Sequence, residues 1–400
     1  MVRRKQYLDK LVKLKDMQVI KVVTGVRRCG KSTLLQQFQE YLREQGVEEG
    51  QIISLNFEKL ENEPLLEYHA LYGYIKERLL PEQMTYIFLD EIQKVSEFQK
   101  VVDSLFVIER TDIYISGSNA HMLSGELATF LSGRYMEIRM LPLSFAEYYE
   151  LVGGERRDAW NTYFASGGFP YTAYIEDEDI RRDYLQGIYH TVLLKDIVER
   201  KRIQDVSLLE SVVRFLFDNV GNMVSSKKIA DSLTSYGRKT TSATVENYIR
   251  ALEESFILYR AGRYDIKGKQ HLKSLEKYYL VDQGLRRLLF ADGSRDIGHV
   301  LENIVYLELL RRGYQVSVGK VGSHEIDFVA GRGGDRIYCQ VSASILDAQT
   351  FEREIAPLKM VNDHYPKYIV TMDEVPMGED GIKQVNIVNF LLHDRGVAEC

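Results

Sequence analysis

A loop that could bind phosphate lies near the start of the chain. Residues 25–33 read Gly-Val-Arg-Arg-Cys-Gly-Lys-Ser-Thr and fit the pattern G-x-x-x-x-G-K-[ST], known as Walker A. An alternating apolar stretch precedes this loop and a helical stretch, 34–42, follows it. At such a junction the loop's backbone N–H groups and the positive end of the helix favour an anion. We expect Lys31 to contact the β- and γ-phosphates of a nucleotide and the Ser32 hydroxyl to hold Mg²⁺. The predicted nucleotide-binding residues are Gly25, Val26, Arg27, Arg28, Cys29, Gly30, Lys31, Ser32 and Thr33.

Two acids end a predicted strand at 85–91, which reads Thr-Tyr-Ile-Phe-Leu-Asp-Glu. A strand buried on both faces can present carboxylates only at its carboxyl end, where parallel sheets bind ligands. This pattern is typical of Walker B: Asp90 would hold Mg²⁺, directly or through water, and Glu91 would orient and polarise the attacking water. An acidic pair can also cap a helix, but the phosphate loop upstream favours the catalytic interpretation.

Small polar residues follow the next predicted strand, 112–116. Ser118 or Asn119 could place a polar side chain beside the γ-phosphate, the role called sensor 1. The alternative is a turn that caps the helix predicted from Ala120 to Leu131, and both roles can hold together.

Length and composition indicate several globular domains. A chain of 400 residues exceeds one core, and its 45% hydrophobic and 28% charged residues are ordinary for soluble proteins. We see neither an apolar run that could span a bilayer nor the apolar segment of a signal peptide. The 3 cysteines show no metal-ligand spacing or disulfide pattern, so we expect a cytoplasmic location.

Charge is distributed unevenly along the chain. The net charge of −6 argues against a general nucleic-acid-binding surface. The segment from Ser225 to Phe290, however, has 13 lysines and arginines against 7 acids. This excess could serve phosphate contacts or be an ordinary solvated surface.

The order of these segments, with a second strand at 52–58 and a fifth at 135–140, favours a parallel α/β sheet. It resembles the AAA+ class of P-loop ATPases and, within that class, a large prokaryotic family that joins such a core to a C-terminal nuclease-like domain. The resemblance spans the chain and rests on residues 25–33, 89–91, 116–119, 131–134, 141–145 and 167–170.

This resemblance implies further roles. Arg134 matches the arginine finger, which reaches the γ-phosphate of a neighbouring subunit and stabilises the transition state. The chain would then be a homo-oligomer, with a hexamer as one option and nucleotide at subunit interfaces; the alternative is an arginine paired with a surface acid. Asn56 matches a position that can restrain the catalytic glutamate. ATP is favoured over GTP because the pattern [NT]-K-x-D is not found. Residues 151–202 read as helices that would form a lid, and the Gly167-Gly168 turn within them could serve function or packing.

Three predicted helices and a hairpin in the middle segment describe a winged helix-turn-helix. The helices are 206–217, 225–233 and one that begins at Thr241 or Ser242. A basic loop with Arg263, Lys267, Lys269 and Lys273 joins strands at 257–260 and 277–280. The third helix could enter a DNA groove, with wing lysines near phosphate. Winged helices also serve as protein–protein modules.

The last segment resembles the PD-(D/E)XK nuclease fold. Asp327 matches the first acid of that motif, but Gln340 and Ser342 stand where a glutamate and a lysine are expected. Since these two residues cannot replace the metal ligand and the charge, we expect a domain inactive as a nuclease. Residual cleavage would have to use Glu302, Glu325 and Asp327.

We therefore expect an α/β protein with four regions: an AAA+ core at 1–150, a helical lid at 151–204, a winged helix-turn-helix at 205–290 and a restriction-endonuclease-like domain at 291–400. The expected function is ATP hydrolysis coupled to movement or assembly of the C-terminal domains, with ATP and Mg²⁺ as cofactors and no membrane contact. The catalytic residues would be Lys31, Glu91, Ser118, Asn119 and Arg134, and the metal ligands Ser32 and Asp90. The alternatives are a DNA-binding ATP-dependent switch, a switch that binds a partner with little turnover, and a Mg²⁺-dependent nuclease.

Overall fold

The computed structural model describes residues 2–119, 133–290 and 297–393. The helix predicted at 120–131 lies outside these residues. The chain divides into two compact units. Unit 1 consists of Met1–Pro142 with Glu254–Phe256, and unit 2 of Leu143–Glu253 with Ile257–Cys400. None of the helices within the described ranges has the length and apolar character needed to cross a bilayer.

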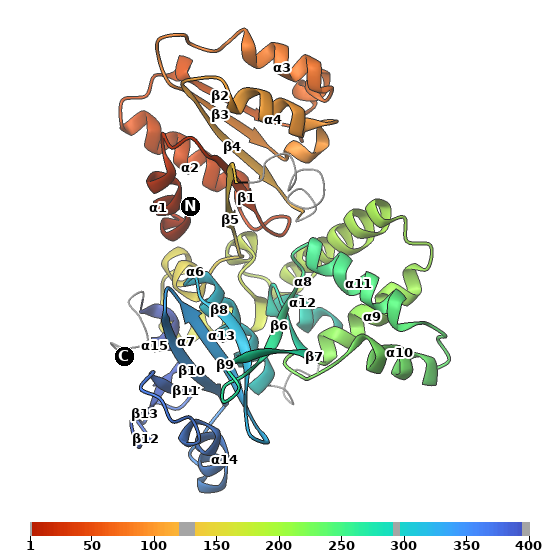
Figure 1. The fold of residues 1–400 in the computed structure, drawn as a ribbon, viewed down its shortest axis with the longest axis vertical. Coiled ribbons are helices and arrows are strands. Elements are labelled where there is room, and N and C mark those ends of the chain that lie inside the picture. Colours follow the sequence, from red (N-terminus) through yellow and green to blue (C-terminus); the bar gives the residue numbers. More distant parts are fainter. Residues whose placement is uncertain (1, 120–132, 291–296, 394–400) are drawn as a thin grey trace. The chain divides into compact units, whose positions relative to one another are not determined.

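A five-stranded parallel sheet forms the centre of unit 1 (Figure 1), as the sequence predicted. Its order is β2-β3-β4-β1-β5, so β1 lies between β4 and β5. The strands are β1 Ile20–Thr24, β2 Ile52–Asn56, β3 Thr85–Asp90, β4 Thr111–Gly117 and β5 Tyr135–Arg139. The helices are α1 Lys5–Leu14, α2 Lys31–Glu44, α3 Tyr68–Lys76 and α4 Phe98–Phe106, with short 3₁₀ turns η1 Glu49–Gln51, η2 Leu60–Leu65 and η3 Ile92–Lys94.

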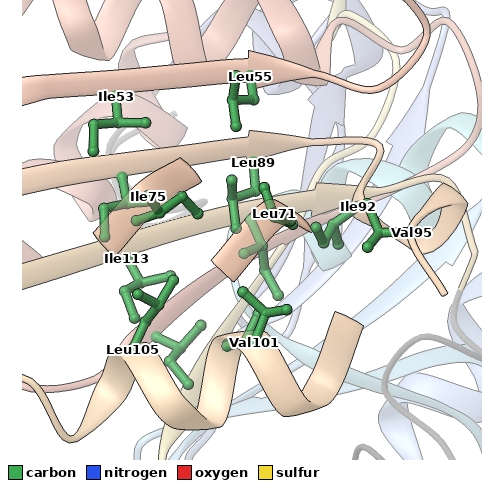
Figure 2. Close-up of a cluster of buried hydrophobic side chains, with 14 of the residues drawn as sticks. Ile53, Leu55, Leu71, Ile75, Leu89, Ile92, Val95, Val101, Leu105 and Ile113 are labelled. Atoms are coloured by element: carbon green, nitrogen blue, oxygen red, sulfur yellow. The ribbon is translucent and has the colours of Figure 1, made fainter. Parts of the chain in front are cut away.

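Helices α3 and α4 cover one face of this sheet. Alternate strand residues, among them Leu55, Leu89 and Ile113, point toward Leu71 of α3 and Leu105 of α4 (Figure 2). Since side chains alternate along a strand, the residues between them face the opposite side of the sheet, which α2 contacts. There the rings of Phe38, Phe88 and Tyr114 pack together.

An ion pair is buried on this second face. Lys21 of β1 donates to Asp112 of β4 and, at 2.7 Å, to the carbonyl of Met17. The Tyr114 hydroxyl and the Asp16 amide donate to Asp112 at 2.8 and 2.9 Å. The pair is satisfied by these bonds, which is the condition for tolerating buried charge.

Unit 2 begins with helices that precede its sheet. They are α6 Phe145–Val152, α7 Arg156–Ser166, η5 Pro170–Tyr174, α8 Glu178–His190 and the π-helical η6 Thr191–Glu199, then α9 Val206–Asp218, α10 Ser226–Ser235 and α11 Ser242–Glu254. The segment predicted as a lid is therefore helical, and it belongs to unit 2.

An eight-stranded mixed sheet completes unit 2, in the order β12-β13-β11-β10-β9-β8-β6-β7 (Figure 1). The strands are β6 Leu258–Asp265, β7 Gln270–Leu280, β8 Gln315–Val321, β9 His324–Arg332, β10 Asp335–Val341, β11 Lys367–Thr371, β12 Gly378–Glu379 and β13 Ile382–Asn386. The helices between and after them are α12 Gln283–Leu289, α13 Ile297–Arg311, α14 Ala348–Lys359 and α15 Ile387–Leu392.

The predicted border at 290 does not separate two sheets. Strand β6, which the sequence assigned to a wing, pairs in parallel with β8, so Arg263 lies opposite Val318. Arg263 is part of β6 and not of the basic loop, which is reduced to the short turn that includes Lys267 and Lys269. Sequence periodicity predicted these strands but could not reveal their partner, because pairing depends on tertiary contacts.

Gly167 and Gly168 pack against the segment that begins α12. A Cβ on Gly167, whose φ is 79°, would lie 1.7 Å from Oδ1 of Asp282, and one on Gly168 would lie 2.2 Å from the carbonyl of Leu143. Asp282 accepts hydrogen bonds from the amides of Gly168 at 2.6 Å and Gly284 at 2.8 Å. The structure gives this glycine turn a packing role.

We expect Asp282 to make unit 2 less stable as pH rises from about 4 to about 7. Burial raises the pKa of this carboxyl to about 7, and the two amide bonds only partly offset that effect. The folded state then holds a proton that the unfolded state releases, so stability falls by up to about 1.4 kcal/mol per pH unit in this range. Urea unfolding followed by fluorescence of Trp160, the one tryptophan of the chain and part of unit 2, measures the effect. Asp282→Asn should reduce the slope by up to about 1.4 kcal/mol per pH unit, and Asp218→Asn, on the exposed end of α9, should leave it unchanged; an unchanged slope in Asp282→Asn would contradict the assignment.

Candidate nucleotide-binding site

The phosphate loop joins β1 to α2, as the pattern predicts. Gly25 has a φ of 150°, and a Cβ there would lie 2.2 Å from the carbonyl of Met140. Gly30, the N-cap of α2, has a φ of 103°. Both positions therefore need glycine, the first for close backbone approach and the second for left-handed backbone. The N-terminus of α2, where a helix has N–H groups without intrahelical partners, lies at Lys31, Ser32 and Thr33.

A buried arginine that the sequence patterns did not reveal braces this loop from behind. Arg4, only 2% exposed, donates through Nη1 to the carbonyl of Cys29 at 3.0 Å and through Nη2 to that of Leu141 at 2.8 Å. It thereby ties the loop to the segment after β5. Nothing in the local sequence signals this role, because the bonds span 25 and 137 residues.

Three polar side chains lie in a row across the ends of neighbouring strands. Asn56 ends β2 and is in register with Asp90 at the end of β3, and Ser116 lies near the end of β4. Asn56 Nδ2 donates to Asp90 Oδ2 at 2.7 Å, and the Ser116 hydroxyl donates to Asp90 Oδ1. This corrects the expectation for Asn56, which holds Asp90 and not Glu91, the glutamate predicted to be catalytic. The alternation of side chains explains the difference: Asn56, Asp90 and Ser116 share the face toward α2.

Asp90 and Ser32 form a site suited to Mg²⁺. The Ser32 hydroxyl also hydrogen-bonds Asp90, and both residues line a pocket of about 570 Å³ beside α2. Burial raises the pKa of Asp90, with the charge of Glu91 adding to the effect. A hydroxyl and a carboxylate next to one another fit a cation that prefers oxygen ligands and keeps several waters. The predicted metal residues are thus brought together.

Glu91 is held in an unusual backbone conformation. Its φ of 55° lies in the left-handed region, which is uncommon for residues other than glycine and concentrated at functional sites. The Glu91 amide donates to the Ser116 hydroxyl at 3.1 Å. Because of this turn from β3 into η3, the Glu91 side chain does not point in the direction that continued alternation along β3 would give it.

Both oxygens of the Glu91 carboxylate have partners. Oε1 lies 3.4 Å from Nζ of Lys31, and Oε2 accepts from the Ser118 hydroxyl at 3.2 Å and from the amide of Gln93. Burial alone would raise the pKa of Glu91, but Lys31, Gln93 and Ser118 together lower it below its usual value. The group is therefore ionised and able to accept a proton.

The Lys31 ammonium is bonded within the phosphate loop. Besides Glu91, its ammonium donates to the carbonyls of Gly25 at 3.2 Å and Val26 at 3.3 Å, and the residue is 3% exposed. An anion entering the loop must therefore exchange these contacts for its own. Of the two predicted sensor residues, Ser118 contacts Glu91, while Asn119 follows it directly in the chain.

Arg134 directly precedes β5, at the amino ends of the strands and so opposite the carboxyl ends where the phosphate loop lies. Its carbonyl accepts from the amide of Ile20, the first residue of β1, and β5 begins at the next residue. Its guanidinium pairs with Asp103 of α4 at 2.5 Å and lies over the ring of Phe106. The ion pair is largely exposed, with 43% and 37% of the two side chains accessible. The structure therefore contains the surface pairing that was the alternative to the finger role.

The C-terminal carboxylates converge around a lysine that the sequence patterns did not reveal. Nζ of Lys277, on β7, lies 2.9 Å from Glu302, 2.7 Å from Glu325 and 3.4 Å from Asp327. Burial would lower the Lys277 pKa, but the three acids raise it. Burial raises the pKa of Asp327 to about 7, and the negative charge of Glu302 is the next largest cause. The available signal was a lysine directly before the buried apolar run Tyr278–Leu280 at the end of β7.

The predicted motif residues of that region serve structure. Gln340 accepts from the Asp327 amide at 3.3 Å and donates to Glu354 at 2.8 Å. Ser342 donates to the carbonyl of Ser344. In the described part of the chain no group of three or more His, Cys, Asp or Glu residues is arranged to hold a metal ion.

Comparisons with known proteins agree with the site in unit 1. Residues 18–149 match a family described as an AAA domain, and residues 157–296 match a domain of unknown function (DUF8612). An uncharacterized protein of Haemophilus influenzae is 41% identical over 399 residues, 98% of this chain and 99% of that protein. Another, from Methanocaldococcus jannaschii, is 27% identical and covers 92% of this chain and 84% of that protein.

Among solved structures, the Walker-type ATPase PABY2304 of Pyrococcus abyssi aligns with a TM-score of 0.50 and 14% identity, over 72% of this chain and 96% of that one. At this identity the likeness concerns the fold alone, and that fold is the P-loop ATPase fold. The chain therefore belongs to the same family as the Haemophilus influenzae protein and carries an AAA domain over residues 18–149.

Proposed function

We propose that this protein is an ATPase that hydrolyses ATP at the phosphate loop of unit 1. One observation carries the proposal. Lys31, Glu91 and the Ser32–Asp90 pair, which lie up to 60 positions apart in the sequence, meet at the carboxyl ends of β1 and β3. A loop for phosphate, a hydroxyl–carboxylate pair for a cation and an ionised glutamate are the parts that phosphoryl transfer to water requires.

The residues of the chain would act in a definite order. The loop amides and Lys31 bind the β- and γ-phosphates, so the Lys31 ammonium leaves Glu91. Ser32 and Asp90 would hold Mg²⁺, which neutralises phosphate charge when bound. Glu91 would accept a proton from a water whose oxygen attacks the γ-phosphorus. The bond between the γ-phosphorus and the oxygen bridging to the β-phosphate breaks, its electron pair stays on ADP as negative charge, and the water oxygen leaves as part of inorganic phosphate.

The placement of Arg134 supports a site completed by a second subunit. Arg134 lies beside Ile20, four residues before the end of β1, which puts it roughly 13 Å along the strand from the phosphate loop. That span exceeds the reach of its side chain toward the loop of its own subunit. The exposed pair with Asp103 contributes at most about 1 kcal/mol and can be exchanged for a phosphate of a neighbour. A homo-oligomer, with hydrolysis coupled to the C-terminal unit, is the arrangement we propose.

Removing the lysine of the loop tests the proposal. We expect Lys31→Ala to weaken ATP binding by about 10- to 100-fold, because the variant cannot form charge-assisted hydrogen bonds to phosphate at this position. Lys13→Ala, an exposed lysine of α1, should leave binding and turnover unchanged. Calorimetric titration with ATP and a phosphate-release assay measure both quantities. A wild-type protein that binds ATP without any turnover would overturn the hydrolase proposal.

A DNA-binding switch is the second candidate. The observation that favours it is the pair of exposed lysines, Lys267 and Lys269, at the turn between β6 and β7. The isolated bridge between Val224 and Glu276 also connects the segment before α10 to the hairpin, as in a winged helix.

Charge reversal discriminates this candidate. We expect Lys267→Glu with Lys269→Glu to weaken duplex binding and to reduce its salt slope by about 2, one for each DNA phosphate that the variant no longer neutralises. Lys383→Glu, an exposed lysine of β13, is the matched control and should bind as wild type. Fluorescence anisotropy of a labelled duplex across salt concentrations gives the slope. Equal slopes in the double variant and the wild type would rule out DNA binding by this turn.

A further inference from the structure

One hydrogen bond of the Glu91 carboxylate comes from a residue outside the phosphate-binding and metal-binding motifs. Gln93, in η3 two residues after Glu91, donates its side-chain amide to Oε2 of Glu91 and lies 3.4 Å from the Ser118 hydroxyl. Neither the phosphate loop, the Ser32–Asp90 pair nor the strand ends require a glutamine at this position.

The two oxygens of Glu91 are held in different ways. Oε2 is bound by Ser118 at 3.2 Å and by Gln93, and both of these come from the carboxyl ends of β3 and β4. Oε1 faces Lys31 at 3.4 Å. Of these three contacts, the one at Oε1 involves a group that must move when phosphate enters the loop, because Lys31 then turns to the phosphates.

The orientation of the Gln93 amide follows from chemistry. A carboxylate accepts hydrogen bonds only, so the NH₂ group must face Glu91 and the carbonyl oxygen must face away. That carbonyl oxygen, Oε1 of Gln93, is buried and accepts no hydrogen bond from the described residues. An acceptor with an unused lone pair is thus adjacent to the carboxylate that would activate water.

We propose that Gln93 is a positioning residue that, with Ser118, anchors Oε2 of Glu91 so that Oε1 becomes the proton-accepting oxygen once Lys31 leaves it. Nucleotide binding then frees one defined oxygen of a carboxylate that is already fixed in orientation. This inference rests on the proposed ATPase function and adds to it the device that orients the base.

The substitution Gln93→Leu tests the anchor, since leucine has similar volume and neither donates nor accepts. We expect kcat to fall by about 10- to 100-fold, because a base misplaced by about 1 Å loses that much. The dissociation constants of ATP and ADP should stay within about threefold of wild type, because Gln93 contacts neither the loop nor Lys31. Gln93→Glu should lower kcat at least as far, since it places a second carboxylate against Glu91. Gln45→Leu and Gln45→Glu, at the exposed end of α2, are the matched controls.

Non-additivity distinguishes an anchor from a structural prop. If Gln93 acts through Glu91, Gln93→Leu should have little further effect on kcat in a Glu91→Gln background, whereas independent effects would multiply. Phosphate release and calorimetric titration of the full-length chain supply both kcat and the dissociation constants. A Gln93→Leu protein with wild-type kcat, or one whose nucleotide affinities fall together with kcat, would overturn the inference. Absence of turnover in the wild type would instead overturn the proposed function, so the two failures are distinguishable.

Discussion

Replacing Glu91 by glutamine should abolish most ATP turnover while ATP binding is retained. The substitution keeps the shape of the side chain and its contacts at Oε2 in part, but it removes the ionised group that is placed to accept a proton from water at the loop. General-base contributions of this kind are about 10²- to 10⁴-fold, so we expect kcat to fall by at least about 10²-fold. ATP affinity should hold or rise, because the Lys31 ammonium no longer has to leave a negative partner.

A phosphate-release assay and calorimetric titration measure the two quantities on one preparation. Glu44→Gln, at the exposed end of α2, is the matched control and should behave as wild type in both. If Glu91→Gln turned over ATP within a few-fold of wild type, another group would be the base and the mechanism would have to be revised. If it lost ATP binding instead, Glu91 would have a structural role in the loop.

Replacing Arg134 by alanine should lower kcat by about 10³-fold without weakening ATP binding to the isolated chain. Arginine fingers contribute about 10³- to 10⁵-fold to turnover by stabilising charge in the transition state. Arg43→Ala is a close control: Arg43 also forms a surface ion pair, with Glu49, and its side chain is 42% exposed against 43% for Arg134. Wild-type turnover per subunit should also rise with protein concentration.

Mixing two inactive variants separates a finger in trans from a local effect. Arg134→Ala keeps an intact phosphate loop, and Lys31→Ala keeps an intact finger. When they are combined, a Lys31→Ala subunit can supply Arg134 to the loop of its neighbour, so activity should reappear in the mixture. Turnover that stays at the level of the separate variants, or an Arg134→Ala protein as active as wild type, would contradict the trans role.

Much of the fold could be predicted because local patterns determine it. The apolar strands and the helices with apolar residues at helical spacing were predicted within a few residues of their observed bounds, as for β3 and α9. Pairing between distant strands was not predictable in this way. Strand β6 has the pattern of a wing but pairs with β8, because the choice of partner depends on surfaces assembled from the whole unit.

The site shows the same division. Gly25, Lys31, Ser32, Asp90 and Glu91 were evident from spacing, since a phosphate loop and a strand-end acid pair are local motifs. Arg4 and Lys277 were missed because their partners lie at least 25 positions away. Asn56 was assigned to the wrong acid, since only the register of β2 with β3 places it beside Asp90.

The sequence by itself determined that unit 1 has a phosphate loop followed by an acidic strand end, because glycine, lysine, serine and acid at fixed spacing are required by the local chemistry of phosphate binding. Only the tertiary structure decided how the carboxylate of Glu91 is divided between Lys31 on one side and Ser118 and Gln93 on the other. The order of strands brings the ends of β1, β3 and β4 to one edge, and that order is set by packing across the whole sheet. It also puts Arg134 at the opposite edge, too far from the loop of its own chain, which is the physical reason to look for its phosphate in a neighbouring subunit.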